Sequence, residues 1–310
     1  MTQYWSRKVS LIVATNDKAL DLSELHIVFS VSQQDIQSPN SAIIRIYNAA
    51  DATVFSIQEE FTRIVLQAGY EGSMGVIFDG EIKQIKIGRE NATDTYLDMF
   101  CADGDSAYNF AVVNTSLAAG SRPIDVVKAV CTATNPYGVT EGYVPDLPLN
   151  QLPRGKVLFG MARDTMRDLA NGTDTSWSIQ AGKLTVVPIT GYLPGQAIVL
   201  TSKSGLIGRP EQTQDGIKAK SLLNSQMAVG GRIQIDNKSI NQTSGVNGFF
   251  IPYDQYTGFQ YLASVADDGF YRIISVEHEG DSRGNSWYTN LLCLAVDDAV
   301  PISVAVKGWG

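Results

Sequence analysis

The sequence predicts a mainly β protein with a smaller α+β insertion in its middle. Two observations on the 310-residue chain indicate this. Short apolar or alternating runs, separated by Gly, Pro and Asn, fill both ends of the chain, which is typical of antiparallel barrels and sandwiches. The middle instead carries apolar residues at helical spacing. A chain of this length is expected to form two or three domains.

The end of the chain also resembles its beginning. Asp79-Gly80 precedes a strand-like run, a polar turn and a second run that contains Cys101. Asp268-Gly269 precedes the same succession, and its second run contains Cys293. Alternating runs lie upstream of both hairpins, at 43–48 and 218–224. We therefore expect two similar β domains in one chain.

Residues 1–105 are expected to form the first β domain. Apolar runs bounded by turn residues predict its strands, at 9–13, 25–31, 42–48, 61–69, 76–87 and 95–102. A helix is expected over 51–59 with Asp51 as its N-cap. Pro39 and Asn40 indicate a turn at 37–40, and a second turn is expected at 70–75.

Residues 106–190 are expected to form the α+β insertion. Pro123 is placed in the first turn of one helix. Apolar residues predict a second helix that ends at Asn171-Gly172, and these residues are Val157, Met161, Met166, Leu169 and Ala170. Residues 176–180 and 184–189 are typical of a β-hairpin, and 137–150 of a loop.

The rest of the chain is expected to be a linker followed by the second β domain. Residues 191–216 are rich in Gly and Pro and are predicted to be mostly loop. Residues 217–310 are again β-rich, with strands at 217–223, 231–235, 271–276 and 287–295. The polar and aromatic segment 241–270 is expected to be either a mobile loop or a partner contact.

Composition excludes several classes of function. The formal net charge of −8 argues against a protein that grips nucleic-acid phosphates. It is compatible with an acidic channel wall along which DNA passes without binding. No apolar run approaches the roughly 18 residues of a membrane span, and the N-terminus lacks the order of a signal peptide. We expect a protein made in the cytosol, with no membrane partner.

The cysteines and histidines do not suggest a reactive site. Cys101, Cys131 and Cys293 are an odd number of cysteines in apolar surroundings, so we expect reduced, structural thiols. A catalytic thiol needs a basic partner, and the chain has only His26 and His278. His278 lies between two glutamates, where a solvated or strand-face residue is a better interpretation than a metal ligand.

The acidic residues give no specific motif either. Asp103-Gly104-Asp105 and Asp297-Asp298 do not follow the calcium-loop pattern and are interpreted as turn acids. Glu59-Glu60 is interpreted as a solvated helix face, because adjacent helical side chains diverge by about 100°. No nucleophile elbow, P-loop or dinucleotide-binding pattern is present. We therefore predict no catalytic, cofactor-binding or metal-binding residues.

Several stretches spread from about residue 20 to 300 together resemble one family. They are 39–42, 46–48, 67–72, 77–80, 103–109, 152–157, 205–217 and 222–224. In this order they resemble the baseplate hub proteins of contractile-tailed bacteriophages. The sequence departs from the family pattern mainly at 241–262.

That resemblance implies fold, assembly and partners. Hub proteins of this kind carry two antiparallel β-barrel domains of the tail-tube type, with smaller inserted domains. Three chains form a pseudo-hexameric ring that joins a six-fold tail tube to a three-fold spike and leaves a channel for DNA. The resemblance implies a homotrimer in the virion baseplate, assembled in the host cytoplasm among other baseplate proteins, and no active site.

Two other functions stay open at this point. A host-surface sugar-binding module is suggested by aromatic residues that could stack on sugars, namely Tyr253, Tyr256, Phe259 and Tyr261. A tail-associated cell-wall hydrolase needs only two carboxylates, which need not be close in sequence. For a ring, we expect parts of 61–87 and 217–235 to face the lumen or the neighbouring subunit.

Overall fold

Antiparallel strands dominate the structure, a computed structural model that describes residues 6–15, 17–36, 38–213, 215–241, 265–266 and 268–296. The first region follows the predicted order of strands and adds a short one, β2. A helix, α1 (Asp51–Glu60), lies between its fourth and fifth strands. The strands are β1 (Arg7–Ala14), β2 (Ala19–Asp21), β3 (His26–Gln34), β4 (Ser41–Tyr47), β5 (Arg63–Tyr70), β6 (Ser73–Arg89) and β7 (Thr95–Ala102).

The middle region contains the longer helices. Its helices are α2 (Asp105–Phe110), α3 (Pro123–Thr134) and α4 (Ala162–Gly172), with a 3-10 turn, η1 (Asn135–Tyr137). Its strands are β8 (Val112–Leu117), β9 (Thr140–Glu141), β10 (Lys156–Met161), β11 (Thr175–Gln180) and β12 (Lys183–Pro188). β8 and β10 form a separate two-stranded ribbon, and β9, β11 and β12 form a small sheet.

The last region returns to strands. They are β13 (Ile198–Leu200), β14 (Leu206–Gln212), β15 (Ile217–Leu222), β16 (Arg232–Ile235), β17 (Phe270–Asp281) and β18 (Trp287–Ala295), with the 3-10 turn η2 (Asn237–Ser239). Within the described residues, no helix is long and apolar enough to cross a membrane.

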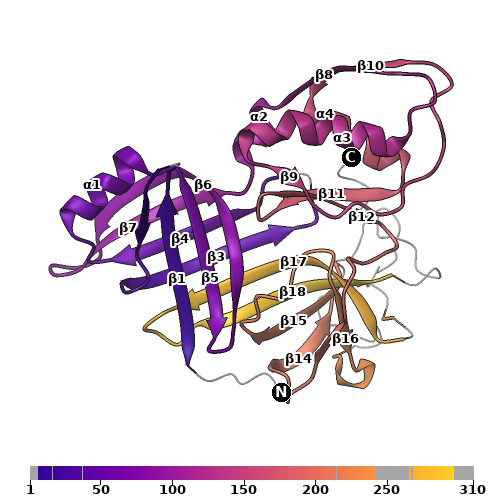
Figure 1. Cartoon of the computed structure of the whole chain (residues 1–310). Coiled ribbons are helices and arrows are strands. Elements are labelled where there is room, and N and C mark those ends of the chain that lie inside the picture. The colour runs from indigo at the N-terminus through magenta and orange to yellow at the C-terminus, as the bar shows by residue number, and fades with distance from the viewer. Residues whose placement is uncertain are drawn as a thin grey trace, which may run out of the picture.

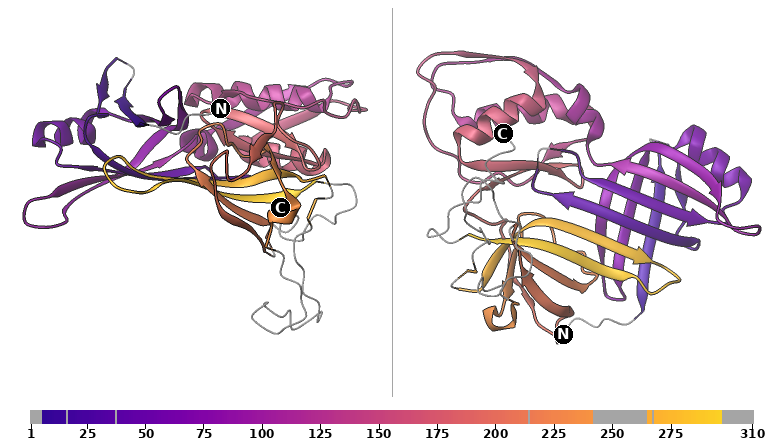
Figure 2. Two further views of the ribbon diagram at one scale, coloured as in Figure 1. Left: turned by 90° about the horizontal axis from the view of Figure 1, so that it is seen from below. Right: turned by 180° about the vertical axis from the view of Figure 1, so that it is seen from behind.

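One sheet runs through both β regions (Figure 1). Its strand order is β14-β15-β18-β17-β3-β4-β7-β6-β5-β1-β2, and β16 and β13 extend it beside β17. β17 joins the regions because its second half pairs with β3, from Ser275 opposite Gln34 to Asp281 opposite Val28. Seen from behind, the two β regions lie side by side with the helical region next to them (Figure 2).

The sheet contains the same five-strand pattern twice. In the first unit (β3–β7) the hydrogen-bonded order is β3-β4-β7-β6-β5, and in the second unit (β14–β18) it is β14-β15-β18-β17-β16. In both, the first strand pairs with the second, the second with the fifth, the fifth with the fourth and the fourth with the third. Every one of these pairs is antiparallel. The repeat expected from the sequence is thus present in strand order.

A β-bulge fixes how the two units align. In the first, β6 gains one extra residue after Ile82, which faces Cys101 of β7. In the second, β17 gains one extra residue after Ile273, which faces Cys293 of β18. A bulge locally bends a strand and increases its twist, so both units are bent at the same place. This alignment makes the cysteines equivalent.

The same alignment corrects one sequence comparison. Since Ile82 is equivalent to Ile273, Asp79 is equivalent to Phe270. Asp268-Gly269 therefore stands two positions before the equivalent of Asp79-Gly80. Asp79-Gly80 lies inside β6, whereas Asp268-Gly269 lies in the turn before β17, so the two dipeptides match only by coincidence. The predicted match of 43–48 with 218–224 holds except at its end, because Ala42 faces Cys101 as Ile217 faces Cys293. Asn48 is therefore equivalent to Leu223 and not to Asn224.

Three apolar cores hold these regions. The first lies inside the curled sheet of β1–β7 and also takes in Leu223 and Trp287 from the last region. The second lies between α3, α4, β8 and the β11–β12 hairpin. The third fills the last region around Tyr271 and Ile273. Trp287 contacts Phe29 edge to face at 5.5 Å, so the first core seals the seam between the two units.

The helix predicted over 157–170 is wrong in its first part. Val157 and Met161 belong to β10, and α4 begins only at Ala162. Pairing with β8 over Lys156–Met161 overrides the helical spacing. The loop prediction for 191–216 is also wrong in part, because β13 and β14 lie there and β14 opens the second unit.

Smaller differences concern caps and turns. Asp51 is the first residue of α1 and Ala50 is its N-cap, without a side-chain hydrogen bond. The turn expected at 70–75 is shorter, since β5 ends at Tyr70 and β6 begins at Ser73. Pro123 begins α3 as predicted, and the Asp125 carboxylate accepts a hydrogen bond from the Arg122 backbone N–H at 2.8 Å.

The predicted hairpin of the insertion is confirmed. β11 and β12 pair from Gln180 opposite Lys183 onward, with Ala181 and Gly182 in the turn. Both turn residues have positive φ, 50° and 70°, as a two-residue hairpin turn that follows the strand twist requires.

Candidate assembly surfaces

The cysteines and histidines do not form a reactive group. The three cysteines are free, and burial raises the pKa of Cys101 to about 12 and that of Cys131 to about 11. Such thiols stay protonated and unreactive near neutral pH. Nε2 of His26 lies 2.7 Å from Oδ1 of Asp281, which joins the start of β3 to the end of β17.

His278 lies in the core. Its Nδ1 is 2.9 Å from the Thr289 hydroxyl, and burial lowers its pKa to about 4. The imidazole is therefore neutral at neutral pH and serves as a buried polar contact between β17 and β18. Glu277 and Glu279 are partly exposed and point to the opposite face of the strand. The strand-face interpretation holds, and the side chain is not solvated.

The candidate acids lie apart from one another. Asp103 is buried, which raises its pKa to about 7, and it accepts a hydrogen bond from the Gly182 N–H at 3.0 Å. It lies in the bend between β7 and α2, as predicted for a turn acid, and it is a buried link to the β11–β12 hairpin. Asp105 pairs with Lys83, and Glu60 pairs with Lys18 at 2.9 Å. Within the described ranges no cluster of His, Cys, Asp and Glu could hold a metal, and 297–298 lie outside those ranges.

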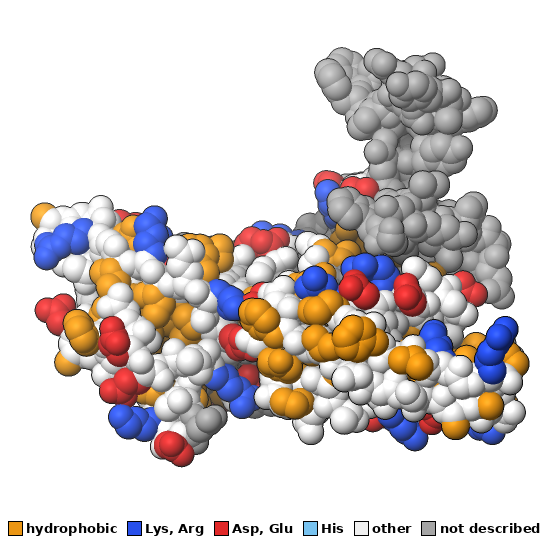
Figure 3. Space-filling view, turned by 90° about the horizontal axis from the view of Figure 1, so that it is seen from above, with side chains coloured by type: hydrophobic (Ala, Val, Ile, Leu, Met, Phe, Trp, Pro, Cys, Tyr) orange, Lys and Arg blue, Asp and Glu red, His pale blue; other side chains and the backbone are white. Residues whose placement is uncertain are grey.

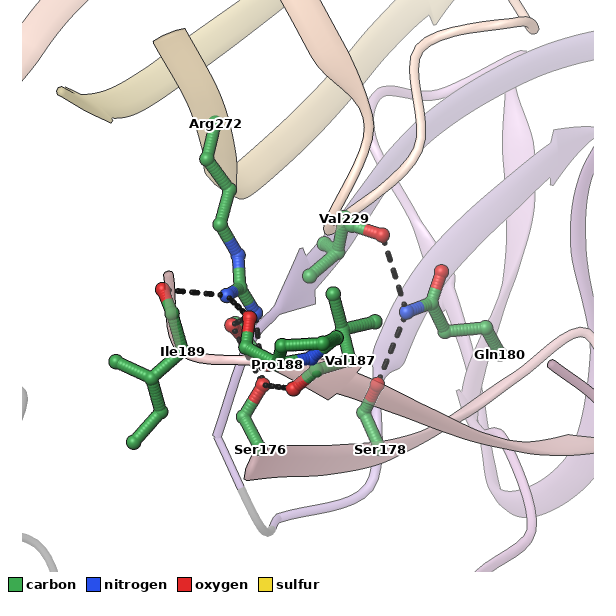
Figure 4. Close-up of polar contacts among 9 residues, drawn as sticks. Ser176, Ser178, Gln180, Val187, Pro188, Ile189, Val229 and Arg272 are labelled. Carbon is green, nitrogen blue, oxygen red and sulfur yellow. Dashed lines mark hydrogen bonds and ion pairs between the residues drawn. The ribbon is translucent and has the colours of Figure 1, made fainter. Parts of the chain in front are cut away.

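One buried arginine joins the three regions (Figure 4). Arg272 on β17 is 3% exposed and pairs with Asp35, just after β3. It also donates to Ser176 Oγ at 2.7 Å and to the carbonyl oxygens of Pro188 and Ile189. Such charge-assisted contacts to strands of all three regions fix the insertion against the seam between the units. No sequence pattern indicated this junction, because its members are up to 237 positions apart.

The ends of the eight-strand path from β14 to β6 leave two strand edges. On one side, β6 pairs with β5 from Ser73 up to Glu81 and no further. On its other side, β6 pairs with β7 up to Arg89. The edge of β6 over 84–89 therefore has no strand beside it among the described residues. At the other end, β14 pairs with β15, and within the described ranges its outer edge carries one bridge, from Glu211 to Asn241. Unpaired edges are sites where another strand can add.

The open face of this path carries both signs of charge. Glu277, Glu279 and Asp281 lie on β17, with Lys218 and Lys220 on β15. On the first unit, Arg45 pairs with the buried Asp98 at 2.6 Å, and this contact raises the pKa of the guanidinium. The predicted interface segments 61–87 and 217–235 form strands whose side chains point alternately to the core and to this open face. Acidic and basic side chains are mixed on the open face, so its charge is not uniformly negative.

A second surface is apolar. The β8–β10 ribbon buries Val113 and Leu158 against the helices and exposes the alternate residues. Val157 is 72% exposed and Phe159 is 78% exposed, with Val112 and Phe110 nearby. Seen from above, hydrophobic side chains are exposed in several places across the molecule (Figure 3). Exposed apolar patches of this kind mark protein contacts.

Comparisons with known proteins place the fold. No protein-family model and no curated protein sequence matches the chain. Several solved structures do match the chain. The chain shares its fold with phage tail proteins.

Three structures illustrate the likeness over nearly the whole chain. The 43 kDa tail protein of prophage MuSo2 from Shewanella oneidensis has a TM-score of 0.58 at 7% identity, over 94% of this chain and 98% of that one. A tail protein from Neisseria meningitidis MC58 has a TM-score of 0.55 at 10% identity, over 96% and 98%. The E. coli c3393 protein, a type VI secretion component described as similar to the T4 tail proteins gp27 and gp5, has a TM-score of 0.54 at 10% identity, over 96% and 79%.

These likenesses confirm the fold class that the sequence predicted, mainly antiparallel β with tail-tube-like β domains. At such low identity the shared property is the fold. The expected tyrosine-rich contact at 253–261 lies outside the described residues.

Proposed function

We propose that the protein is a structural baseplate hub protein of a contractile phage tail. Three chains form a ring in which two similar units per chain give six positions around one axis. One face of the ring accepts a six-fold tail tube and the other a three-fold spike. The repeat of five strands with equivalent bulges carries this proposal, because a three-fold assembly of duplicated units is the simplest adaptor between the two symmetries.

The similar structures support the assignment to a tail. Two of them are described as phage tail proteins and a third as a type VI secretion component. A further likeness, with a TM-score of 0.53, is to a Francisella PdpA-VgrG complex, of whose chain 59% is covered. We accordingly place the protein in the virion tail, assembled in the host cytoplasm, with tube, spike and other baseplate proteins as partners.

The buried junctions support a structural role over an enzymatic one. Arg272, Asp35 and Asp103 are engaged in contacts between regions, and His278 is engaged by Thr289 within the last region. The open face of mixed charge is proposed to line the channel, where alternating signs would leave no continuous basic track for DNA phosphates to bind. Among the described residues no observation favours the sugar-binding or hydrolase alternatives over this one.

The mass of the protein in solution tests the proposal. Light scattering coupled to size exclusion is expected to give three times the chain mass of 33.6 kDa, either alone or with a spike partner. A reconstruction of the assembly by electron microscopy should then show two units per chain alternating around the axis. A single-chain mass at all concentrations and with each candidate partner would contradict the ring.

A further inference from the structure

We infer that the free edge of β6, residues 84–88, pairs antiparallel with the outer edge of β14 and the residues that follow it, namely Glu211–Thr213 and Asp215, from a second copy of this chain. This inference rests on the proposed ring and specifies which strands close it. It follows from the alignment of the two units, in which the pairing of β17 with β3 has no counterpart inside the chain.

The seam inside the chain is the template. There the fourth strand of the second unit, β17, pairs with the first strand of the first unit, β3. The counterpart of β17 in the first unit is β6, and the counterpart of β3 in the second unit is β14. The equivalent contact thus joins β6 to β14, which lie at opposite ends of the eight-strand path in one chain. No strand among the described residues takes either place, and a second copy of the chain has both strands.

The alignment also gives the register of this contact. Ser275, Glu277 and His278 face Gln34, Ser32 and Val31. Their counterparts on β6 are Gln84, Lys86 and Ile87. The counterparts of 34, 32 and 31 are 215, 213 and 212, because Gln212 faces Ile217 as Val31 faces Ala42. Lys86 is therefore expected opposite Thr213 of the second copy, and Ile87 opposite its Gln212.

Burial at equivalent positions points to the same strand. His278 is 1% exposed, and it lies opposite Val31 of β3. Ile87, its counterpart, is 50% exposed. A strand paired along 84–88 would place Gln212 of the second copy opposite Ile87, as Val31 lies opposite His278. The apolar residue stands where burial is expected, and it lacks only the covering strand.

Charge is complementary across the inferred contact. β6 exposes Lys86 and Arg89 along the free edge. The facing segment of the second copy has two exposed acidic residues, Glu211 and Asp215, and one exposed basic residue, Arg209. Opposite charges on facing strands stabilise a pair and set its register.

Two features of β14 define the extent of the contact. Its bulge between Ile207 and Glu211 ends the simple equivalence to β3, so the pairing begins at 211. Asn241 occupies part of the outer edge, donating to the Pro210 carbonyl at 2.8 Å and accepting from the Gln212 N–H at 3.1 Å. Incoming β6 would replace these two hydrogen bonds with those of a longer ladder.

Disulfide trapping tests the register. In a chain with Cys131→Ala, the pair Lys86→Cys and Thr213→Cys is expected to cross-link copies up to a closed trimer under mild oxidation by glutathione disulfide. The matched control is Lys86→Cys with Gln212→Cys. A shift of one residue points the second side chain to the other face of the strand, so this pair should not cross-link.

A second arm uses charge at two similar isoleucines. Ile87→Glu should raise the concentration at which the assembly dissociates at least about tenfold, because the carboxylate would be buried at the edge. Ile43→Glu, on the open face and 48% exposed, should change it by less than about twofold. Both variants should keep the wild-type thermal transition of the single chain, since both positions are exposed there.

The outcomes separate this inference from the proposed function. If the wild type is a trimer but the Lys86–Thr213 cross-link does not form, or Ile87→Glu and Ile43→Glu have equal effects, the edge pairing is overturned. The proposed ring itself is not contradicted by that result. A single-chain mass without any cross-link at high concentration counts against the ring itself. Cross-linking of the Gln212 control in place of Thr213 would overturn the register.

Discussion

The two five-strand units share their pairing and differ in what surrounds it. Both have the same strand order and a bulge opposite a buried cysteine. In the first unit a ten-residue helix, α1, separates the second and third strands, and β5 is flanked by β1. In the second, β16 has four residues and is flanked by the parallel strand β13. Register and curvature are thus common to both, and the outer strands vary.

The difference extends to equivalent residues on the fourth strand. The second unit has the buried Arg272 and His278, where the first has Glu81 and the exposed Ile87. His278 lies at the seam with β3 and Arg272 lies against the insertion. Ile87 lies at the free edge of β6, and Glu81 lies opposite Arg63 of β5. One repeat has therefore acquired buried polar contacts inside the chain, while the other keeps a surface available for assembly. Paired substitutions at these positions test this comparison.

The largest effect is expected at Arg272. Arg272→Ala leaves the Asp35 carboxylate without its buried partner and should lower the free energy of unfolding by about 3–5 kcal/mol. At the equivalent position, Glu81→Ala removes only a hydrogen bond from the Ser106 hydroxyl and should cost about 1 kcal/mol. Urea unfolding of both variants measures the difference. Similar losses of unfolding free energy at the two positions would contradict the difference between the two units.

The next largest effect depends on pH and concerns His278. Its pKa in the folded chain, about 4, lies below the ordinary 6.5, so its contribution to stability is present above pH 6.5 and is lost as the pH falls towards 4. His278→Gln, which does not titrate, should remove up to about 3 kcal/mol of this loss. Unfolding free energies of wild type and variant, compared from pH 7 to 4, should converge or cross as the pH falls.

Two controls accompany this measurement. Ile87→Gln, at the equivalent exposed position, should shift the unfolding free energy by the same amount at every pH. Asp103 acts in the opposite direction, because its pKa of about 7 is raised above the ordinary 3.8, and its contribution is lost as the pH rises through 7. The wild-type profile alone therefore mixes both signs, and Asp103→Asn is needed to separate them. A pH-independent difference between His278→Gln and wild type would refute the assignment.

A smaller effect is expected at Gly280. A Cβ there would overlap the Phe29 ring, so Gly280→Ala should lower the unfolding free energy by about 1–3 kcal/mol. The equivalent residue, Arg89, already carries a long side chain at the free edge, and Arg89→Ala should change the stability by less than about 0.5 kcal/mol. Thermal unfolding of both variants measures these changes. An unchanged stability of Gly280→Ala would show that Phe29 can move away from the added Cβ.

The smallest effects concern one equivalent pair of arginines. Arg63 pairs with Asp79 at 2.7 Å, and its counterpart Arg232 lies over the Phe270 ring at 5.0 Å. Alanine at either position should cost less than about 1 kcal/mol. Only the loss at Arg63 should shrink between low salt and 1 M salt, because salt screens an exposed ion pair. Equal salt dependence would show that the two contacts are of one kind.

Local patterns in the sequence predicted much of the fold. Alternation and turn residues placed most strands of both β regions, and Ala181-Gly182 fixed the hairpin of the insertion. The two runs with cysteines pointed to a duplication that the pairing bears out, although the Asp-Gly dipeptides did not belong to it. These features depend on side-chain periodicity and backbone preferences of neighbouring residues, which a single chain displays directly.

The tertiary structure decided the rest. β10 and β14 form because partners in β8 and β15 accept their hydrogen bonds, against a helical spacing in one case and a Gly-rich composition in the other. The Arg272 junction, the burial of His278 and the free edge of β6 all depend on residues more than 100 positions apart or on the absence of a neighbouring strand among the described residues. Sequence determines periodicity, whereas pairing between distant strands determines which side chains become buried.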